Sequence, residues 1–580
     1  MDICPALIWK GNTTMRRLFP LHIILTAVLF SVILNTSMEA HAAAGIIALP
    51  DAESADDTAR HLRIIGTSDL HGKFFPWDYA LNQENNSGSV VQLSTAVKKY
   101  RNGNTILVDA GDTIQGNFAD IFARADESVH PMIQALNAIG YDVWVTGNHE
   151  YDYKMDIIKD TIADLDATTL TGNVYDETGR PLADGYTILN KNGIRVALIG
   201  MVTQNIVKWN PRNLQNCTVT DPLDETRRII DKIEGQYDVL IGVFHLGLEN
   251  ELTVPNSGVT DICNACPEFD VMISSHEHKL VPGTLINGVL VVQNKDAAQT
   301  MSVVDLTLEP DKDGWKVMDK TSESIQIADY APDPSLTEML APYDEAAKKD
   351  AETPIGMLEG GPLAPENETP GIPSAQIEDT ALMDLLNSVM LYYSDAEVSA
   401  APFTVMDADL QPGTIRKCDT SQIFKYSNTL YKLHMTGAQL KKYMEWSANY
   451  YNTFQPGDQT ISFNPDFAEY NYDMFSGINY EINIANEPGS RIENLTWPDG
   501  TPVEDDDEFD IAVNSYRANS HLLEAGDIYS EGDDLPQLVD MDIRSDIGGI
   551  REQIRDYIVN VEGGTITPEV DHNWKITGIE

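Results

Sequence analysis

Five short apolar runs in the first half of the chain are each followed by side chains that can bind metal ions. Runs of this length with few polar residues are typical of β-strands that are buried on both faces. In layered α/β proteins the carboxyl ends of adjacent parallel strands lie at one edge of the sheet, so we expect the side chains that follow them to converge. The runs, each with the residues that follow it, are 62–65 with Asp69 and His71, 105–108 with Asp112, 143–145 with Asn148, 239–244 with His245, and 271–273 with His276 and His278.

These side chains combine carboxylates, an amide and imidazoles. Such a mixture suits borderline divalent metals, whereas calcium prefers oxygen ligands alone and many structural zinc sites are rich in cysteine. A single histidine or one Gly-Asp pair has an ordinary explanation as a hydrogen-bonded structural residue or a turn. Five such segments in order indicate instead a site for two divalent cations.

The order of these segments resembles the motif series of the calcineurin-like metallophosphoesterases. The segments that carry the resemblance are Asp69-x-His71, Gly111-Asp112, Gly147-Asn148-His149-Glu150, His245 and His276-x-His278. The resemblance implies an α/β protein with a four-layer α/β/β/α sandwich and two divalent metal ions, which could be Mn, Zn, Co, Fe or Mg. It implies that one metal is held by Asp69, His71, Asp112 and His278, and the other by Asp112, Asn148, His245 and His276.

His149 follows the implied ligand Asn148 directly, but by the same resemblance it is not a ligand itself. We expect its imidazole to stabilise charge on phosphoryl oxygens or to protonate the leaving group. Asp152, three residues later, is placed to orient the His149 ring, as in other carboxylate–histidine pairs. The ordinary alternative for Asp152 is an acidic residue at the start of a helix.

The chain divides into two domains joined by a proline-marked connector. The first domain, about 60–310, alternates short β-branched runs with amphipathic stretches, which is typical of alternating strands and helices. Proline residues then punctuate 325–375, a linker that includes a predicted helix at 336–349. The second α/β domain, about 376–562, has predicted helices at 379–393 and 437–450 and predicted strands at 479–484 and 509–513.

The second domain resembles the C-terminal domain of the bacterial 5'-nucleotidase family, through segments 379–387, 399–403, 424–430, 470–477 and 514–518. Its Ala-Ala-Pro-Phe, Tyr-Asn-Tyr-Asp and Asn-Ser-Tyr-Arg-Ala sequences are most similar to the 2',3'-cyclic-nucleotide 2'-phosphodiesterase/3'-nucleotidase branch. The resemblance implies that Tyr426 and Tyr516 sandwich the nucleobase, a stacking contact that accepts any base. Without it, either tyrosine would be interpreted as a core or interface residue.

Other polar residues of the second domain are weaker candidates for substrate contacts. Asn428 could form a hydrogen bond with the base, although asparagine is also a common turn residue. Arg517 could contact phosphate or ribose, and Arg544 and Arg551 are further candidates.

Two departures from the 5'-nucleotidase pattern bear on the substrate. The glycine-rich segment ending in arginine is replaced by 399–403, and no glycine pair follows the second aromatic, since Ala518 follows Arg517. We therefore expect a secreted metal-dependent phosphohydrolase that opens 2',3'-cyclic nucleotides to 3'-nucleotides and then releases phosphate to give nucleosides. The alternatives are a 5'-nucleotidase or UDP-sugar hydrolase using the same metals and, in another class, a non-catalytic surface or adhesion protein.

The N-terminal segment and the net charge indicate where the protein works. Met15 with the basic Arg16 and Arg17, an apolar run at 23–34 and Ala40-His41-Ala42 predict a signal peptide over 1–42, whose first 14 residues would then be a start-site error. The apolar run is too short to span a membrane, so we expect a secreted or periplasmic protein with no membrane insertion. With 39 basic and 90 acidic residues, the net charge of −51 argues against binding of nucleic-acid polymers. We expect a monomer whose partners are small nucleotides.

Two further motifs have ordinary explanations. Cys263 and Cys266 form a Cys-x-x-Cys pair, which we interpret as a local disulfide or unpaired thiols because no second pair completes a zinc site. The acidic run at 504–508 is typical of a solvated turn.

Overall fold

The computed structural model describes residues 59–579, apart from 124–128, 252–253, 406–407 and 427. The predicted signal peptide therefore lies outside the described residues. Within the ranges that are described, no helix has both the length and the apolar character needed to cross a membrane.

The first six-stranded sheet contains four strands that follow the order of the chain. Strands β1, β4, β5 and β6 are parallel, and β15 and β16 extend the sheet beyond β1 in antiparallel pairing. The spatial order is β16 (Gly314–Gln326), β15 (Thr300–Asp311), β1 (Arg60–Thr67), β4 (Thr105–Asp109), β5 (Val143–Val145) and β6 (Thr168–Leu170). Because β16 belongs to this sheet, the first domain continues beyond residue 310.

The second six-stranded sheet has the same design. Its four central strands are parallel, and one antiparallel strand closes each edge. The spatial order is β13 (Val281–Ile286), β14 (Val289–Gln293), β12 (Val271–Ser274), β11 (Val239–His245), β9 (Ile194–Val202) and β8 (Tyr186–Lys191).

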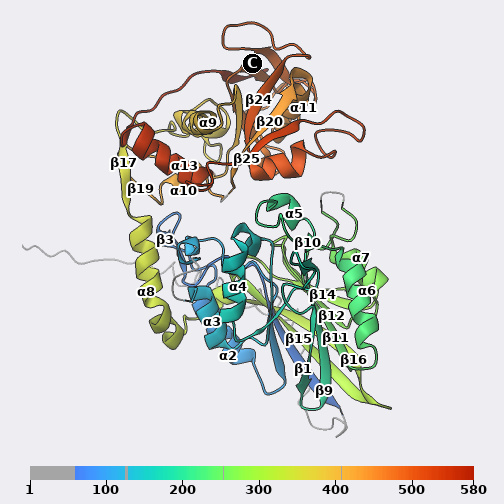
Figure 1. The fold of residues 1–580 in the computed structure, drawn as a ribbon. Helices are drawn as coiled ribbons and strands as arrows, with labels where there is room; N and C mark the ends of the chain where they lie inside the picture. Colours follow the sequence, from blue (N-terminus) through green and yellow to red (C-terminus); the bar gives the residue numbers. More distant parts are fainter. Residues whose placement is uncertain (1–58, 124–128, 252–253, 406–407, 427, 580) are drawn as a thin grey trace, which may run out of the picture. The chain divides into compact units, whose positions relative to one another are not determined.

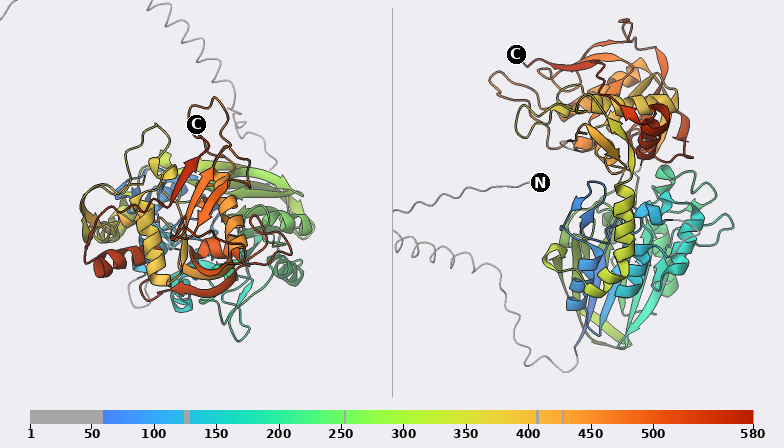
Figure 2. Two further views of the ribbon diagram at one scale, coloured as in Figure 1. Left: turned by 90° about the horizontal axis from the view of Figure 1, so that it is seen from above. Right: turned by 90° about the vertical axis from the view of Figure 1, so that its left-hand side faces the viewer.

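The two sheets pack face to face, with helices on their outer faces (Figures 1 and 2). Alternate residues of one strand serve different layers: Ile64 of β1 packs between the sheets, whereas Ile65 packs under α2 (Val90–Tyr100) and α3 (Pro131–Ile139). On the other side, α6 (Pro222–Ile233) and α7 (Val259–Ala265) cover the second sheet. These four layers confirm the predicted α/β/β/α sandwich.

The predicted connecting helix is α8 (Pro334–Ala351). Asp333 caps its start by accepting hydrogen bonds from the backbone N–H groups of Ser335 and Leu336. The buried face of α8, which includes Leu336 and Leu340, joins the same hydrophobic core as α2 and α3. The helix is thus part of the outer layer of the first domain rather than an exposed linker.

The second domain is built on a five-stranded sheet. Its strands, in spatial order, are β21 (Asp473–Ser476), β18 (Val398–Pro402), β24 (Glu508–Asn514), β20 (Leu430–Thr436) and β25 (Gln537–Ile543). The predicted helices appear as α9 (Ala381–Ser394) and α11 (Gly437–Ser447). A smaller sheet pairs β22 (Asn479–Asn483) with β23 (Ile492–Thr496) and β27 (Trp574–Thr577), so this domain continues beyond residue 562.

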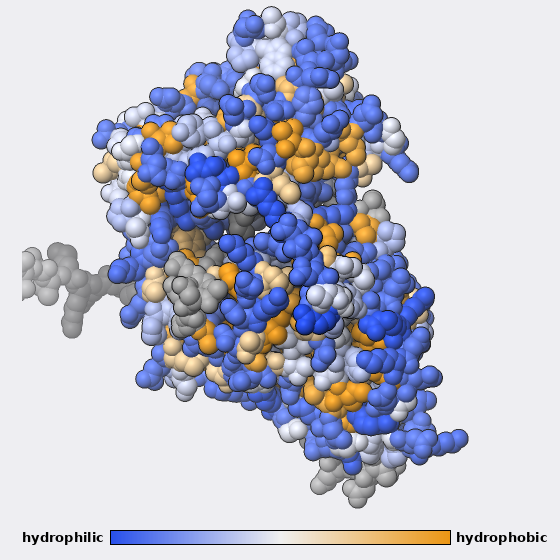
Figure 3. Space-filling model, viewed as in Figure 1, coloured by the Kyte–Doolittle hydropathy of each residue, from blue (hydrophilic) through white to orange (hydrophobic). Residues whose placement is uncertain are grey.

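Hydrophilic residues cover most of the face of the molecule shown in Figure 3, and apolar residues form scattered patches between them. This distribution agrees with the large excess of acidic residues in the chain. A high net charge keeps a protein soluble and discourages self-association.

Candidate functional site

The structure brings the seven predicted metal ligands together at the carboxyl ends of strands from both sheets. Their positions are Asp69 and His71 after β1, Asp112 after β4, Asn148 after β5, His245 at the end of β11, and His276 and His278 after β12. Ligand atoms of Asp69, His71, Asp112 and His278 lie within 4.8 Å of one another, and so do those of Asp112, His245 and His276. Asp112 belongs to both groups.

Five of these seven residues have a left-handed backbone, with positive φ angles. The angles are 53° at Asp69, 44° at His71, 54° at Asp112, 75° at His276 and 57° at His278. For a residue with a Cβ atom this conformation costs about 1 kcal/mol or more. Such strain persists only where surrounding contacts impose it, and its concentration here is typical of a functional site.

In the first group the imidazoles face each other across two carboxylates. The Nε2 atoms of His71 and His278 are 3.1 Å apart. Asp69 Oδ1 lies 3.7 Å from His278 Nε2, and Asp112 Oδ2 lies 3.9 Å from His71 Nε2. Burial lowers the pKa of His71 to about 4, so its ring is neutral and has a free electron pair for a cation.

In the second group two imidazole nitrogens lie beside the amide oxygen of Asn148. Asn148 Oδ1 lies 2.9 Å from His245 Nε2 and 2.8 Å from His276 Nδ1. Asp112 Oδ2 is 3.3 Å from His245 Nε2. The opposite nitrogen of His245, Nδ1, lies 2.7 Å from the carbonyl oxygen of Ala110, which fixes how the ring is turned.

Glu150 holds the loops that carry Asp112 and Asn148, a role that the sequence did not reveal. Its carboxylate is fully buried and accepts hydrogen bonds from the backbone N–H groups of Asp112, Thr113, Ile114 and Gly147. The loops approach so closely that both contain glycine: a Cβ on Gly111 would lie 2.3 Å from the backbone nitrogen of Gly147. The Gly-Asn-His-Glu motif therefore supplies both the ligand Asn148 and the carboxylate of Glu150, which holds the two loops together.

Replacing Glu150 by alanine is expected to destabilise the first domain. Four buried N–H groups would lose their acceptor, and each unsatisfied buried donor costs about 1–3 kcal/mol. We expect the free energy of unfolding, measured by urea denaturation of the metal-free protein, to fall by at least about 3 kcal/mol. Glu150→Gln keeps one acceptor oxygen and should lose less stability. Equal stability of Glu150→Ala and the wild type would show that Glu150 does not hold the two loops together.

His149 lies beside the first group and is paired with Asp152, as the sequence predicts. His149 Nδ1 is 2.7 Å from Asp152 Oδ2, and its backbone N–H donates to Asp112 Oδ1 at 2.8 Å. Its ring centroid is 5.4 Å from that of His71. Burial alone would lower the pKa of His149, but the carboxylates of Asp152 and Asp112 raise it to about 10, so the ring carries a proton that it could donate.

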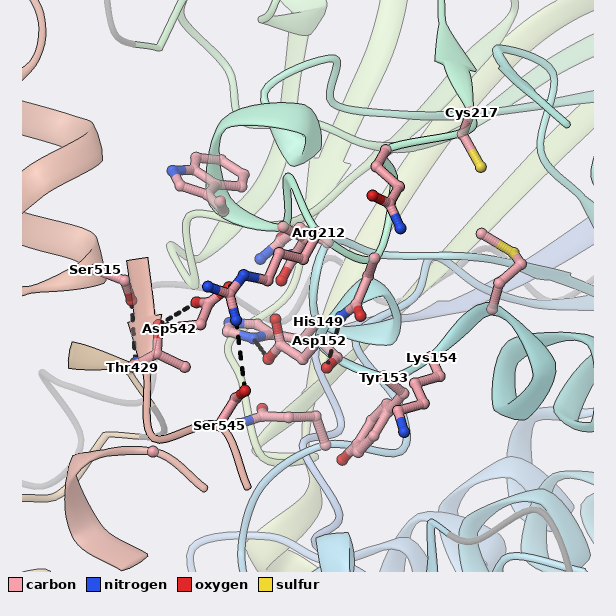
Figure 4. Close-up of a pocket in the computed structure, with 18 of the residues that line it drawn as sticks. His149, Asp152, Tyr153, Lys154, Arg212, Cys217, Thr429, Ser515, Asp542 and Ser545 are labelled. Carbon is pink, nitrogen blue, oxygen red and sulfur yellow. Dashed lines mark hydrogen bonds and ion pairs between the residues drawn. The ribbon is translucent and has the colours of Figure 1, made fainter. Parts of the chain in front are cut away.

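A cavity of about 1280 Å³ opens beside these residues. Asn148, His149 and Asp152 form part of its wall, together with Asn428 and Tyr516 from the second domain. Figure 4 shows the His149–Asp152 pair and, near it, Arg212 with its partners Asp542 and Ser545.

Two tyrosines predicted to hold a base, Tyr426 and Tyr516, keep 39% and 36% of their surface exposed. A third, Tyr470, is 38% exposed, and its ring centroid is 6.2 Å from that of Tyr516 in an edge-on arrangement. Exposed apolar side chains that lie together, unlike single ones, often mark a surface that a ligand or partner covers. The cluster of Tyr426, Tyr470 and Tyr516 therefore fits a stacking surface, and Tyr470 was missed by sequence reasoning.

Arg517 does not reach the cavity, contrary to the prediction of a phosphate or ribose contact. Its side chain is fully buried, with Nε 2.6 Å from Asp473 Oδ2 and the other nitrogens donating to Asn471 and to the carbonyl oxygen of Tyr470. Since these bonds use its donors inside the domain, Arg517 supports the segment that carries Tyr470. Arg544 pairs with Asp546, whereas Arg551 lines the cavity.

The Cys-x-x-Cys pair belongs to the hydrophobic core and not to a metal site. Cys263 lies in α7 and Cys266 follows it, and both side chains are buried against the second sheet without a disulfide between them. Neither belongs to a group of metal-binding side chains among the described residues. In the acidic run, the Asp507 carboxylate accepts hydrogen bonds from the Trp497 side chain and the Glu504 backbone, as expected for a turn.

The donor set fits divalent metal ions. Each group brings carboxylate oxygens and imidazole nitrogens together at about the spacing of hydrogen bonds. Although burial favours a neutral acid, the His245 and His149 imidazoles lower the pKa of Asp112 well below its usual range, so the shared carboxylate is charged. Carboxylate and imidazole ligands in this mixture suit zinc, manganese or iron.

Comparisons with known proteins agree with this geometry. The model of the calcineurin-like phosphoesterase family matches residues 62–280, and that of the 5'-nucleotidase C-terminal domain matches residues 355–522. The trifunctional nucleotide phosphoesterase protein YfkN of Bacillus subtilis is 27% identical over 90% of this chain, which spans only 39% of that relative's length. A 2',3'-cyclic-nucleotide 2'-phosphodiesterase/3'-nucleotidase of Yersinia enterocolitica is 25% identical over 92% of this chain and 90% of its own.

A solved structure shows the same fold. The structure of a proposed 5'-nucleotidase of Staphylococcus aureus has a TM-score of 0.73 to this chain at 21% identity, covering 89% of this chain and all of its own. The two family models together match more than half of the chain, in the two domains described above. The protein is therefore a metallophosphoesterase that joins a calcineurin-like phosphoesterase domain to a 5'-nucleotidase C-terminal domain.

Proposed function

We propose that this protein hydrolyses nucleotides, opening 2',3'-cyclic phosphates to 3'-nucleotides and then releasing phosphate to leave the nucleoside. One observation carries the proposal: the metal-binding groups that share Asp112, the paired His149 and the exposed Tyr516 all lie in or beside one cavity. The name of the Yersinia relative supports the cyclic substrate. So does the absence, from this chain, of the glycine-rich arginine segment of 5'-nucleotidases.

The proposal includes two divalent cations. Asp69, His71, Asp112 and His278 would hold one, and Asp112, Asn148, His245 and His276 would hold the other. When bound, such a pair supplies Lewis acidity to the phosphate ester and makes a water molecule acidic enough to attack near neutral pH. Asn148 contributes a neutral oxygen, so the protein ligands do not cancel all the positive charge that an anionic substrate needs.

His149 would move the proton in both reactions. In the first, water attacks phosphorus, the bond from phosphorus to O2' breaks, and O2' must gain a proton. In the second, the bond to O3' breaks in the same way. Asp152 accepts at His149 Nδ1, which leaves the protonated Nε2 to donate to the departing oxygen.

The tyrosine cluster would bind the base. We expect Tyr516→Ala to lower kcat/KM for 2',3'-cyclic AMP by about 5- to 150-fold, because stacking of one base contributes about 1–3 kcal/mol. Steady-state kinetics should show little change for glycerol 2-phosphate, which has no base. Tyr392→Ala, at another exposed tyrosine of the second domain, is the matched control. An equal loss on both substrates would contradict a role in base binding.

A substrate panel tests the proposed function. Phosphate release by the manganese-loaded protein should be fastest from 3'-AMP, and 2',3'-cyclic AMP should be converted through 3'-AMP. Preference for 5'-AMP or UDP-glucose would identify a 5'-nucleotidase or UDP-sugar hydrolase instead. No turnover of any of the four would favour the non-catalytic alternative. We also propose that the mature protein is exported and monomeric, which N-terminal sequencing and light scattering of the exported protein would test.

A further inference from the structure

Glu251 lies on the wall of the cavity and contacts one of the metal-binding histidines. Its two carboxylate oxygens are 3.1 and 3.2 Å from Nε2 of His276. The other ring nitrogen, Nδ1, lies 2.8 Å from Asn148 Oδ1 in the second group. We propose that Glu251 is a positioning residue that holds His276 in the tautomer and orientation needed to bind the second cation. This inference rests on the metal centre of the proposed function.

The chemistry follows from the two nitrogens of imidazole. A neutral ring carries one proton, and whichever nitrogen lacks it has the electron pair for a metal. A carboxylate opposite Nε2 attracts the proton to that side, so the electron pair is left on Nδ1, which faces Asn148. A hydrogen-bonded carboxylate also makes the histidine a stronger ligand.

The histidines of the centre are supported in different ways. His71 Nδ1 lies 3.1 Å from the amide oxygen of Gln115, and His245 Nδ1 faces the carbonyl oxygen of Ala110. Both partners are neutral, whereas His276 faces a charged group. Of these three rings, His276 is the one whose outer nitrogen faces a carboxylate.

The surroundings of Glu251 fix its carboxylate in place. The side-chain amide of Asn205 donates to Glu251 Oε2 at 3.3 Å, and the backbone N–H of Glu251 donates to Ser257 Oγ at 2.7 Å. Asn205 directly precedes α5 (Ile206–Trp209), and the Trp209 ring lies against His276 with centroids 5.5 Å apart. The ring of His276 is thus held on one face by Trp209 and at its outer nitrogen by Glu251.

The placement of Glu251 predicts a selective effect. It contacts the second group through the His276 ring, whereas the His71 ring of the first group faces Gln115. Loss of Glu251 should therefore weaken one cation site and leave the other intact. A loss of general folding stability would not discriminate between the two sites.

Manganese binding tests this inference directly. Titration of the metal-free protein with Mn²⁺ by isothermal calorimetry should show two sites in the wild type. In Glu251→Ala the affinity of one site should fall about 10- to 100-fold and that of the other should stay the same. Glu251→Gln keeps a hydrogen-bonding group without the charge, so its affinity should lie between the two. Glu249→Gln, two residues earlier and bonded to Thr260, is the matched control.

The possible results separate the inference from the function on which it rests. Two unchanged sites in Glu251→Ala, or equal weakening of both, would overturn the role of Glu251. A wild-type protein that binds fewer than two Mn²⁺ ions would refute the dinuclear centre itself. Thermal unfolding of each metal-free variant shows whether it is folded. If Glu251→Ala is unfolded, the manganese affinity of Glu251→Gln tests the inference instead.

Discussion

Replacing Asp112 by alanine is expected to abolish phosphoesterase activity and to remove bound metal from both groups. Asp112 is the residue that the two groups share, and its Oδ1 also accepts the backbone N–H of His149. Its loss therefore removes a ligand from each site and releases the proposed proton donor. Activity should fall to the uncatalysed background, and elemental analysis after dialysis should find much less manganese than in the wild type.

Asp109→Asn is the matched control for this variant. Asp109 is equally buried and lies three residues earlier, but its carboxylate bonds Thr67, Thr113 and the Gly111 N–H rather than the groups of ligands. Burial raises the pKa of Asp109 to about 7, so replacement by a neutral amide changes little charge. We expect it to keep most of its metal and activity. Full activity of Asp112→Ala would show that the shared ligand is not required.

Replacing His149 by asparagine is expected to lower kcat by about 10²- to 10⁴-fold while leaving the metal content unchanged. His149 lies beside the ligands without belonging to either group, so its loss removes a proton donor and leaves the metal-binding side chains in place. Steady-state kinetics on 3'-AMP and elemental analysis of the same preparation measure the two quantities. Asp152→Asn should have a smaller effect, because the imidazole remains.

The second domain offers a control for His149 with the same chemistry. His434 is paired with Asp510 through Nδ1 at 2.9 Å, away from the metal-binding groups. His434→Asn should leave kcat unchanged. If His149→Asn lost its metal along with its activity, His149 would be part of the metal centre and not a proton donor.

The ligands could be predicted from sequence because each follows a short, mainly apolar run of the kind that is typical of a buried strand. Strand ends are local features, and parallel strands bring them together at one edge. The edge strand β16 was harder to predict, since polar and charged residues occupy most of its length and only Ile325 in it is buried. An exposed edge strand has no apolar run to mark it, and so the first domain was predicted to end too early.

The roles of Glu150, Glu251 and Arg517 depend on contacts that a sequence does not display. Glu150 accepts hydrogen bonds from backbone N–H groups, including that of Asp112, which lies 38 positions earlier. Nearly every residue has a backbone N–H group, so no side-chain pattern marks these donors. Glu251 meets His276 across 25 positions and follows no pattern. Arg517 follows Tyr516 in a helical turn, where adjacent side chains point about 100° apart, so the ring faces outward and the guanidinium inward.

Anomalous diffraction from crystals of the manganese-loaded protein would test the central claim most directly. We expect two peaks about 3.5–4 Å apart, one on each side of Asp112, as in other two-metal phosphoesterase sites. A single peak, or none within reach of these side chains under metal-replete conditions, would contradict the account.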